Sequence, residues 1–279
     1  MNQILEKSHL NENVARMIIE APLIAAKAEP GQFIILRVRE EGERIPLTIA
    51  DFNRERGTIT IIYQIVGATT RMLDQLKQGD TILDFVGPLG RATVTEGLQR
   101  VAVIGGGVGC AIAYPVVKKL HAQGAWVDTV IGFRSSSLAI LDDEFSAESS
   151  RLFRVSDDGT YGEKGLVTDV LRCLLGNGDK YDEVIAIGPL PMMKYVSLLT
   201  KQFGIKTIVS MNPIMIDGTG MCGCCRLTVG GKMRFACIDG PDFDGHEVDF
   251  DEAIARSSAY KAQERLADEH VCNLLKGGC

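Results

Sequence analysis

The sequence predicts a small antiparallel β-barrel, then a doubly wound α/β domain, then a short cysteine-rich segment. Three observations predict this order. Short β-branched segments separated by turn residues fill the first third of the chain, and apolar strands alternate with helical segments from about residue 98. From residue 212, glycines, cysteines and aspartates replace that alternation. Because 279 residues exceed what most single cores hold, we expect three domains, at 1–97, 98–211 and 212–279.

The N-terminal region carries two clear strand patterns, QFIILRV at 32–38 and TITIIYQIV at 58–66, which are rich in β-branched residues and partly alternate. Strands this short, recurring at roughly ten-residue spacing, are typical of a small closed barrel. A short helix is expected at 69–77, where Thr69 or Thr70 would cap its start. Turn-forming sequences separate the strands at 29–32, 39–44, 53–58, 77–80 and 87–90.

The middle region alternates strands with helices. RVAVIGGG at 100–107 is an apolar strand that ends in glycines, and CAIAYPVVKKLHAQG at 110–124 has helical periodicity. Such alternation predicts a parallel, doubly wound sheet. The remaining strands of this domain are expected at 125–133, 181–188 and 206–211, with a helix at 189–204 and a last helix of the chain near 251–276.

Composition excludes two large classes of function. The net charge is −6 and the isoelectric point about 5.4, whereas nucleic-acid-binding proteins usually carry a basic face. No apolar run approaches the roughly 20 residues of a membrane span. The N-terminal residues lack a basic stretch followed by an apolar one, so no secretory signal is expected and the cytoplasm is predicted. Thiols stay reduced there, so clustered cysteines favour a metal site over disulfides.

A glycine-rich turn, IGGGVGCAIAYP at 104–115, joins the first α/β strand to its helix. Backbone N–H groups at such a turn bind phosphate. The turn departs from the G-x-G-x-x-G pattern, because the third glycine counted from Gly105 would fall at Cys110; a tight turn that merely needs glycine is the alternative. IGPLPMM at 187–193 forms a second such turn. Together the two turns would line one cleft at the carboxyl edge of the sheet.

Eight segments, taken in this order, resemble the ferredoxin-NADP-reductase-like flavoproteins, in the branch whose C-terminal segment carries a [2Fe–2S] cluster. That branch includes the electron-transfer subunit of dihydroorotate dehydrogenase. The chain is more similar to the small subunits of NADH-dependent reduced ferredoxin:NADP oxidoreductase, also described as sulfide dehydrogenase small subunits. The segments are PGQF (30–33), RIPLTIAD (44–51), VGATTRML (66–73), GPLG (87–90), GGGVG (105–109), SDDGTYGEKGLVTDVL (156–171), GPLPMM (188–193) and DGTGMCGCCR (217–226).

The resemblance implies FAD in the barrel and NAD(H) in the α/β domain. Thr48 would lie near the reactive edge of the isoalloxazine, and Arg44 suits a phosphate partner. Two positions depart from many relatives, which have glycine at Thr69 and, at Ile187, a cysteine that faces the nicotinamide. The residues implied at FAD are Arg44, Pro46, Leu47, Thr48, Tyr63 and Gly67, with Thr69 and Thr70 at its pyrophosphate. Those implied at the nucleotide are Gly105, Gly106, Gly107, Gly109, Arg134, Asp157, Asp158, Gly188 and Pro189.

The choice between NAD and NADP depends on the pair Asp157 and Asp158. Relatives that use NADP often have Ser-Arg where this chain has Ser156-Asp157. A carboxylate there would repel a 2′-phosphate and accept a hydrogen bond from a ribose hydroxyl, so NAD(H) is favoured. Arg134 in GFRSSS is the opposing signal, because its guanidinium is able to bind a phosphate.

Three cysteines crowd into DGTGMCGCCRL, and a fourth, Cys237, follows. Asp217, Cys222 and Cys225 are spaced D-x4-C-x2-C, whereas the plant-type [2Fe–2S] loop is C-x4-C-x2-C with a distant fourth cysteine. We therefore predict iron ligation by Asp217, Cys222, Cys225 and Cys237. The alternatives are zinc bound by the three cysteines with His246, Cys224 in place of Cys225, and Asp217 as an ordinary Asp-Gly turn residue. No ligand spacing involves Cys110, Cys173, Cys272 or Cys279, which are expected in the core or on the surface.

The expected function is electron transfer between NAD(H), FAD and the cluster, with no protein acid or base. By resemblance, the chain would pass electrons to a larger subunit that carries its own FAD and [4Fe–4S] clusters, and through that heterodimer to ferredoxin, in an electron-bifurcating reaction. The alternatives are a dihydroorotate dehydrogenase electron-transfer subunit, a sulfide dehydrogenase or other NAD(P)H reductase subunit, and a regulatory subunit that binds nucleotide without turnover. Asp217 favours the ferredoxin:NADP oxidoreductase subunit, because the dihydroorotate dehydrogenase subunits have cysteine at this position.

Overall fold

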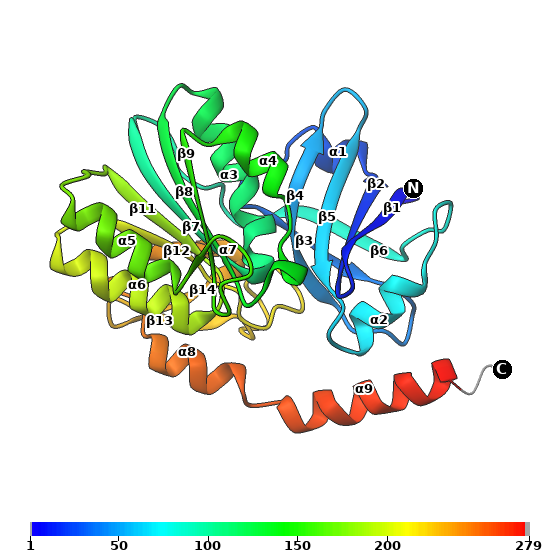
Figure 1. Ribbon diagram of the computed structural model, residues 1–279. Coiled ribbons are helices and arrows are strands. Elements are labelled where there is room, and N and C mark those ends of the chain that lie inside the picture. Colours follow the sequence, from blue (N-terminus) through cyan, green and yellow to red (C-terminus); the bar gives the residue numbers. More distant parts are fainter. Residues whose placement is uncertain (1, 277–279) are drawn as a thin grey trace.

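The computed structural model describes the backbone of residues 2–276 and the side chains of residues 2–269. A barrel and an α/β domain lie side by side, and the last two helices run beneath both (Figure 1). This arrangement confirms the predicted order of an antiparallel sheet, a doubly wound sheet and a cysteine-rich segment.

The barrel is a six-stranded antiparallel sheet in the order β1-β2-β5-β4-β3-β6. Its first and last strands meet through a bridge between Gln3 and Thr81, beside the hydrogen bond from the N–H of Ile82 to the carbonyl of Asn2. Leu73 of the eight-residue helix α2 is buried in its core. The strands are β1 Ile4–Asn11, β2 Val14–Glu20, β3 Phe33–Arg37, β4 Ile45–Asn53, β5 Thr58–Gln64 and β6 Asp84–Leu89; the helices are α1 Pro22–Ala25 and α2 Ala68–Gln75.

The second sheet has the order β10-β9-β8-β7-β11-β12-β15 and is parallel except for its last strand. Alternate residues of the central strand β7 face opposite sides. Val101 and Val103 pack with the core that contains α3 and α4, whereas Ala102 and Ile104 pack with the core that contains α5 and α6. The elements are β7 Arg100–Gly106, α3 Cys110–Ala122, β8 Trp126–Phe133, α4 Asp142–Glu148, β9 Arg151–Ser156, β10 Glu163–Lys164, α5 Val167–Gly176, β11 Glu183–Ile187, α6 Leu190–Gln202 and β12 Thr207–Ser210, with short 3-10 turns η1 Gly107–Gly109 and η2 Ser136–Leu138.

The cysteine-rich segment is built into the sheet that precedes it, because β15 pairs antiparallel with β12. The predicted single helix at 251–276 is wrong. Residues 258–260 separate two helices, and the hydroxyls of Ser257 and Ser258 donate to the carbonyls of Ile254 and Ala255 where the first one ends. Such local bonds compete with helix continuation. The elements are β13 Arg226–Val229, β14 Lys232–Phe235, α7 Ala236–Asp239, β15 Asp242–Asp244, α8 Phe250–Ser257 and α9 Lys261–Lys276.

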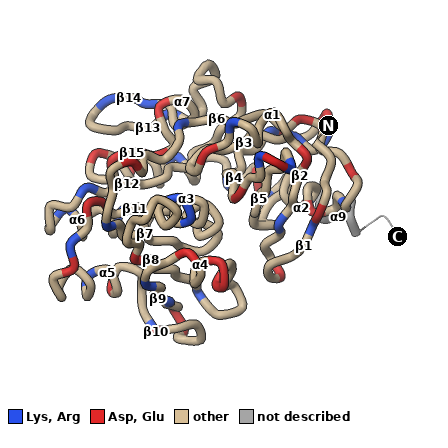
Figure 2. Tube along the Cα trace, turned by 90° about the horizontal axis from the view of Figure 1, so that it is seen from above, with Lys and Arg blue, Asp and Glu red and all other residues tan. Residues whose placement is uncertain are grey.

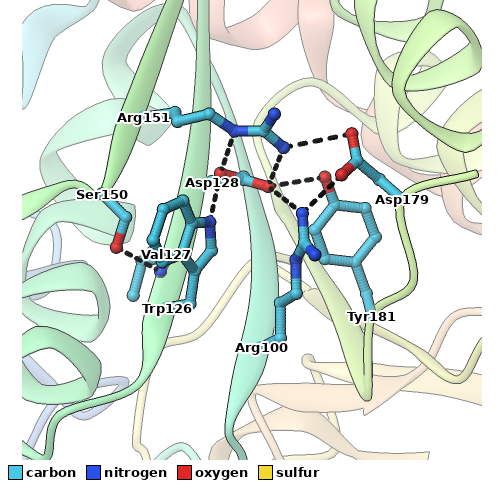
Figure 3. A network of polar contacts seen from close by, with 8 residues as sticks. All are labelled: Arg100, Trp126, Val127, Asp128, Ser150, Arg151, Asp179 and Tyr181. Carbon is cyan, nitrogen blue, oxygen red and sulfur yellow. Dashed lines mark hydrogen bonds and ion pairs between the residues drawn. The ribbon is translucent and has the colours of Figure 1, made fainter. Parts of the chain in front are cut away.

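A buried carboxylate ties together the amino edge of the α/β sheet (Figure 3). Asp128 is 0% exposed, and it accepts from Arg151 at 2.7 and 2.5 Å, from the indole of Trp126 at 2.9 Å and from the hydroxyl of Tyr181 at 2.8 Å. Asp179 pairs with the same arginine at 3.1 Å. The network lies at the end of the strands opposite their carboxyl edge, so it serves the stability of the sheet.

Candidate nucleotide, flavin and cluster sites

A cleft of about 1110 Å³ opens at the carboxyl edge of the α/β sheet. The two glycine-bearing turns predicted to share a cleft do line it, and the barrel closes one side with residues from β2, β5 and the turn after β1. The predicted residues found in its lining are Gly106, Gly107, Gly109, Arg134, Asp157, Gly188 and Pro189. The barrel residues, which the sequence analysis missed, are Asn11, Asn13, Val14 and Gln64.

The glycine turn is shaped by close packing against the second turn. A Cβ added to Gly109 would lie 2.6 Å from the carbonyl oxygen of Ile187 and 2.7 Å from the Cα of Gly188. One added to Gly106 would lie 2.4 Å from the Met192 sulfur. These glycines therefore let the two turns touch, and Gly106, Gly107 and Gly109 line the cleft at the start of α3, where a phosphate fits.

Gly105 plays a different part from the one predicted, because it does not line the cleft. A Cβ at that position would meet the Cys110 sulfur at 2.9 Å, inside the core. Cys110 is fully buried, as expected for a packing residue, whereas Cys173 is exposed. The side chain of Cys272 and the whole of Cys279 lie outside the described residues.

The two adjacent aspartates have different roles. Asp157 lines the cleft opposite Arg134 on the neighbouring strand end. Asp158 instead closes its own turn, accepting from the N–H and the hydroxyl of Thr160 at 2.9 and 2.7 Å. These hydrogen bonds lower the pKa of the Asp158 carboxyl. Of the predicted pair, Asp157 lines the cleft and Asp158 does not, so Asp157 stays the predicted nucleotide contact of the two.

One face of β4 is available to a cofactor. Arg44, Pro46 and Thr48 alternate along the chain, so their side chains share the side away from the barrel core. The Leu47 side chain points the other way and packs against that core, so the predicted contact of Leu47 with FAD would involve its backbone. The Arg44 guanidinium is exposed and lies 3.7 Å from the Asp84 carboxylate, at the rim of the barrel.

The N-terminus of α2 offers a place for a pyrophosphate. The Thr70 hydroxyl accepts from the N–H groups of Val66 and Gly67 at 3.1 and 3.0 Å, so it shapes the turn that starts the helix. Among the described residues, nothing lies within 4 Å of a Cβ built on Gly67, so the approach is open. Thr69 is 5% exposed, and its hydroxyl is 3.4 Å from Glu43. The free N–H groups of a first helical turn attract phosphate.

Tyr63 does not belong to this surface. Its ring is 1% exposed, and its hydroxyl contacts the Met17 sulfur at 3.8 Å within the barrel. Burial, with a smaller effect of Asp74, raises the pKa of this phenol far above its usual range. The predicted contact between the Tyr63 side chain and FAD is corrected, because the alternation of β5 turns this position inward.

The cysteine loop brings two of the four predicted iron ligands together. The sulfurs of Cys225 and Cys237 are 3.2 Å apart and buried, whereas Cys222 is exposed. Burial, and then the neighbouring Cys225, raise the pKa of the Cys237 thiol to about 12. The N–H of Cys224 acts in the opposite direction and lowers the pKa of Cys222. Within the described part of the chain, no group of three or more His, Cys, Asp and Glu side chains surrounds a common metal position.

Asp217 is turned toward its own loop. Its carboxylate accepts from the Thr219 hydroxyl at 2.7 Å and from the N–H groups of Met221 and Cys222 at 3.2 and 3.4 Å. The hydrogen bond from Thr219 is the main reason that the pKa of Asp217 is lowered. The loop amides thus converge on one anionic group. This donor set fits a cluster, whose sulfide and thiolate sulfurs carry negative charge and accept such bonds.

The zinc alternative fails at His246. Its Nε2 atom is 3.1 Å from the Thr200 hydroxyl on α6, on the α/β sheet rather than in the cysteine loop. The Cys224 carbonyl accepts a hydrogen bond from the Arg256 guanidinium at 3.3 Å, which ties the cysteine loop to α8. The Cys224 sulfur faces the Cys222 carbonyl at 3.9 Å.

The cysteine loop rests on the barrel. A Cβ added to Gly218 would lie 2.7 Å from Leu89 and 2.8 Å from Ile35, which belong to β6 and β3. The N–H of Arg91 donates to the Gly240 carbonyl at 2.7 Å, and the Thr93 hydroxyl to Asp242 at 2.6 Å. The loop is therefore held against β6 and against β3, the strand that pairs with β4.

Charged residues are distributed over both domains. Along the described part of the chain, Lys and Arg are interspersed with Asp and Glu (Figure 2). None of the helices in the described chain combines the length and apolar character needed to cross a bilayer.

Two family models match the chain. Residues 2–94 match an oxidoreductase FAD-binding domain, and residues 212–249 match the iron-sulfur cluster binding domain of dihydroorotate dehydrogenase B. These matches support FAD in the barrel and an iron-sulfur cluster in the cysteine-rich segment.

Relatives cover almost the whole chain. A Thermotoga maritima homolog of the dihydroorotate dehydrogenase B (NAD(+)) electron transfer subunit is 46% identical, over 96% of this chain and 95% of its own. The corresponding subunit of Bacillus velezensis is 33% identical, over 88% and 96%. A chain in the structure of NADH-dependent reduced ferredoxin-NADP oxidoreductase, from a study of flavin-based electron bifurcation, is 44% identical, with a TM-score of 0.92 and 97% coverage of both chains. The resemblance stated from the motifs is confirmed.

Proposed function

Because this chain belongs to the family of the dihydroorotate dehydrogenase B electron-transfer subunits and their homologs, we propose that it transfers electrons within an NADH-dependent, bifurcating ferredoxin:NADP oxidoreductase. It is a flavin and iron-sulfur oxidoreductase subunit. The observation that supports the finer proposal is that its sites adjoin one another. The nucleotide cleft opens onto the barrel, and the cysteine loop rests on β6 and on β3, which pairs with β4.

When bound, FAD and a [2Fe–2S] cluster would supply the redox chemistry, which is hydride acceptance from NADH and transfer of single electrons. The protein binds the nucleotide and the flavin and orients them toward each other. Gly106, Gly107 and Gly109 hold the nucleotide phosphates, and Asp157 accepts from a ribose hydroxyl and disfavours a 2′-phosphate. Arg44, Pro46 and Thr48 contact the flavin, while Gly67 and the first turn of α2 bind its pyrophosphate. No side chain acts as a catalytic acid or base.

Iron would be held by Asp217, Cys222, Cys225 and Cys237. Binding requires the Asp217 carboxylate to leave its present hydrogen bonds in the loop, which the exposed position of the loop allows. The amides that it releases would then be free to donate to the sulfurs of the cluster.

The electrons leave through a partner. We propose a larger flavin and [4Fe–4S] subunit in a cytoplasmic heterodimer, with ferredoxin as the distant redox partner. The competing assignment is a dihydroorotate dehydrogenase subunit. Overall identity does not separate the two, because a 46% identical relative is a homolog of the dihydroorotate dehydrogenase B subunit and the ferredoxin-NADP oxidoreductase chain is 44% identical. Asp217 favours the ferredoxin:NADP oxidoreductase, since the dihydroorotate dehydrogenase subunits have cysteine at this position.

The test is purification of the native complex through a tag on this chain, without oxygen. We expect acid-released FAD, iron and sulfide in this chain, and bleaching of the flavin by NADH faster than by NADPH. A flavoprotein with [4Fe–4S] clusters should co-purify with this chain. The complex should then catalyse electron transfer between ferredoxin and NADP together with NADH. Recovery of FMN, or a flavin that NADH leaves oxidised, overturns the assignment. Reduction of orotate by NADH in the complex would instead assign the dihydroorotate dehydrogenase, and tight nucleotide binding without turnover would assign a regulatory subunit.

A further inference from the structure

We propose that the C-terminal helix α9 is a strap that holds α2 in its FAD-binding position, with Asp268 as the positioning residue. The inference rests on the proposed binding of the FAD pyrophosphate at the start of α2. It concerns a residue far from that site in sequence and outside the segments matched by the family models.

The contact is a two-pronged ion pair. The Arg71 guanidinium on α2 donates to the two carboxylate oxygens of Asp268 on α9, at 2.7 and 3.4 Å. Both side chains are partly covered, at 36% and 26% exposure. A planar guanidinium matched to both oxygens fixes orientation as well as distance. Because Arg71 directly follows Thr70, the pair acts on the turn whose N–H groups would meet the phosphate.

The helix that is held cannot position itself. α2 has eight residues, and a helix this short is unstable in isolation. Its C-terminal half is tied to β1, where Lys7 reaches Asp74 at 2.9 Å and the Leu76 carbonyl at 3.1 Å. The N-terminal half is held from the outside by α9, which packs alongside α2 beneath the barrel (Figure 1). Loss of α9 would leave the phosphate end of α2 supported on one side only.

The other end of the strap is anchored at the cysteine loop. On α8, which precedes α9, Arg256 donates to the Cys224 carbonyl at 3.3 Å. Glu252 accepts from the N–H of Thr228 in β13 at 3.1 Å. The two C-terminal helices therefore contact the predicted cluster site at one end and the predicted FAD site at the other.

The experiment measures FAD affinity by titrating FAD into flavin-free full-length protein and following quenching of flavin fluorescence. Asp268→Asn should raise the Kd for FAD about tenfold, as expected for loss of a charged hydrogen-bonded pair. Asp268→Glu should restore most of the affinity, and so should the exchanged pair Arg71→Asp with Asp268→Arg. The matched control is Asp251→Asn on α8, whose ion pair with Lys194 is exposed; its Kd should equal that of the wild type.

A second readout separates positioning from general damage. Binding of ADP-ribose, which would occupy the α/β cleft, should be unchanged in Asp268→Asn. A chain ending at Tyr260 should show the same loss of FAD affinity as Asp268→Asn, or a larger one. If both variants bind FAD within twofold of the wild type, the strap has no positioning role; equal losses of FAD and ADP-ribose affinity would also overturn it. Wild-type protein that binds no FAD would refute the proposed function instead.

Discussion

The sulfurs of Cys225 and Cys237 lie 3.2 Å apart although eleven residues stand between them. The hairpin of β13 and β14 brings them together, since Arg226 pairs with Phe235 and the N–H of Ala236 donates to the Cys225 carbonyl at 3.1 Å. Each cysteine is therefore at one open end of the hairpin. Backbone pairing, rather than the thiols themselves, sets their separation.

Cys225→Ser and Cys237→Ser should each lose most of the cluster, because the hairpin presents these two sulfurs as a pair. Iron and sulfide content per chain and the reduced EPR spectrum are the measurements. Cys224→Ser is the matched control and should keep both, since its sulfur lies against the Cys222 carbonyl. Loss of the cluster in Cys224→Ser but not in Cys225→Ser would reverse the assignment.

Asp217→Ala should make the cluster labile, and Asp217→Cys should keep a [2Fe–2S] cluster with an altered EPR spectrum. The reason is that oxygen is a harder donor than sulfur, so the iron it binds differs electronically from its neighbour. Thr219→Val removes a hydrogen bond to the carboxylate without removing the proposed ligand, and should keep the iron content. Wild-type iron content and spectrum in Asp217→Ala would show that the aspartate is only a turn residue.

Asp157→Arg should narrow the preference for NADH over NADPH by about tenfold or more, because it replaces a repelling carboxylate with a phosphate partner. The rate of flavin reduction by each nucleotide is the measurement. Asp158→Asn is the control, since that side chain closes a turn with Thr160. If Asp158→Asn changes the ratio of the NADH and NADPH rates more than Asp157→Arg does, the placement of the two side chains is contradicted.

Gly109→Ala should impair NADH-dependent flavin reduction and destabilise the fold by about 1–3 kcal/mol, the usual cost of overpacking. The added methyl group would lie 2.6 Å from the Ile187 carbonyl, so the two turns must separate. Gly176→Ala at the end of α5 has open space and should change the free energy of unfolding by less than about 1 kcal/mol. Thermal unfolding and stopped-flow reduction test both variants, and equal behaviour of the two would count against close contact of the turns.

Asp128→Asn should lower stability at neutral pH by about 3 kcal/mol, because it breaks a buried pair with Arg151. Burial alone would raise the pKa of Asp128, but hydrogen bonds from Arg151, Tyr181 and Trp126 outweigh it and lower the pKa. The stabilisation is therefore present above the unfolded value of about 3.9 and is lost as the pH falls through the folded pKa. Chemical unfolding from pH 7 to pH 3 should show the gap between wild type and variant closing. If the difference in unfolding free energy between wild type and variant does not change with pH, the charge of Asp128 does not contribute to stability.

Local patterns in the sequence predicted most of the elements that frame the site. The apolar run before Gly105 and the periodicity after Cys110 are visible without tertiary contacts, because a buried parallel strand and an amphipathic helix leave distinct signatures. The sequence pattern of residues 134–180 predicts no helix or strand, although this range contains α4, β9 and α5. β9 is half-buried and carries two arginines in six residues, so it lacks the apolar signature of the central strands.

The sequence by itself determined the order of the parts, the family, the two glycine turns and the spacing of Asp217 and the cysteines, because these depend on local residue patterns. Tertiary structure decided which of the predicted residues line the cleft and which point into the barrel or close a turn. It separated Asp157 from Asp158, turned Leu47 and Tyr63 into the barrel, added Gln64 to the nucleotide cleft and joined Asp268 to Arg71. The physical reason is that side-chain direction depends on which face of an element is covered, and that contacts across long stretches of chain exist only after the domains pack together.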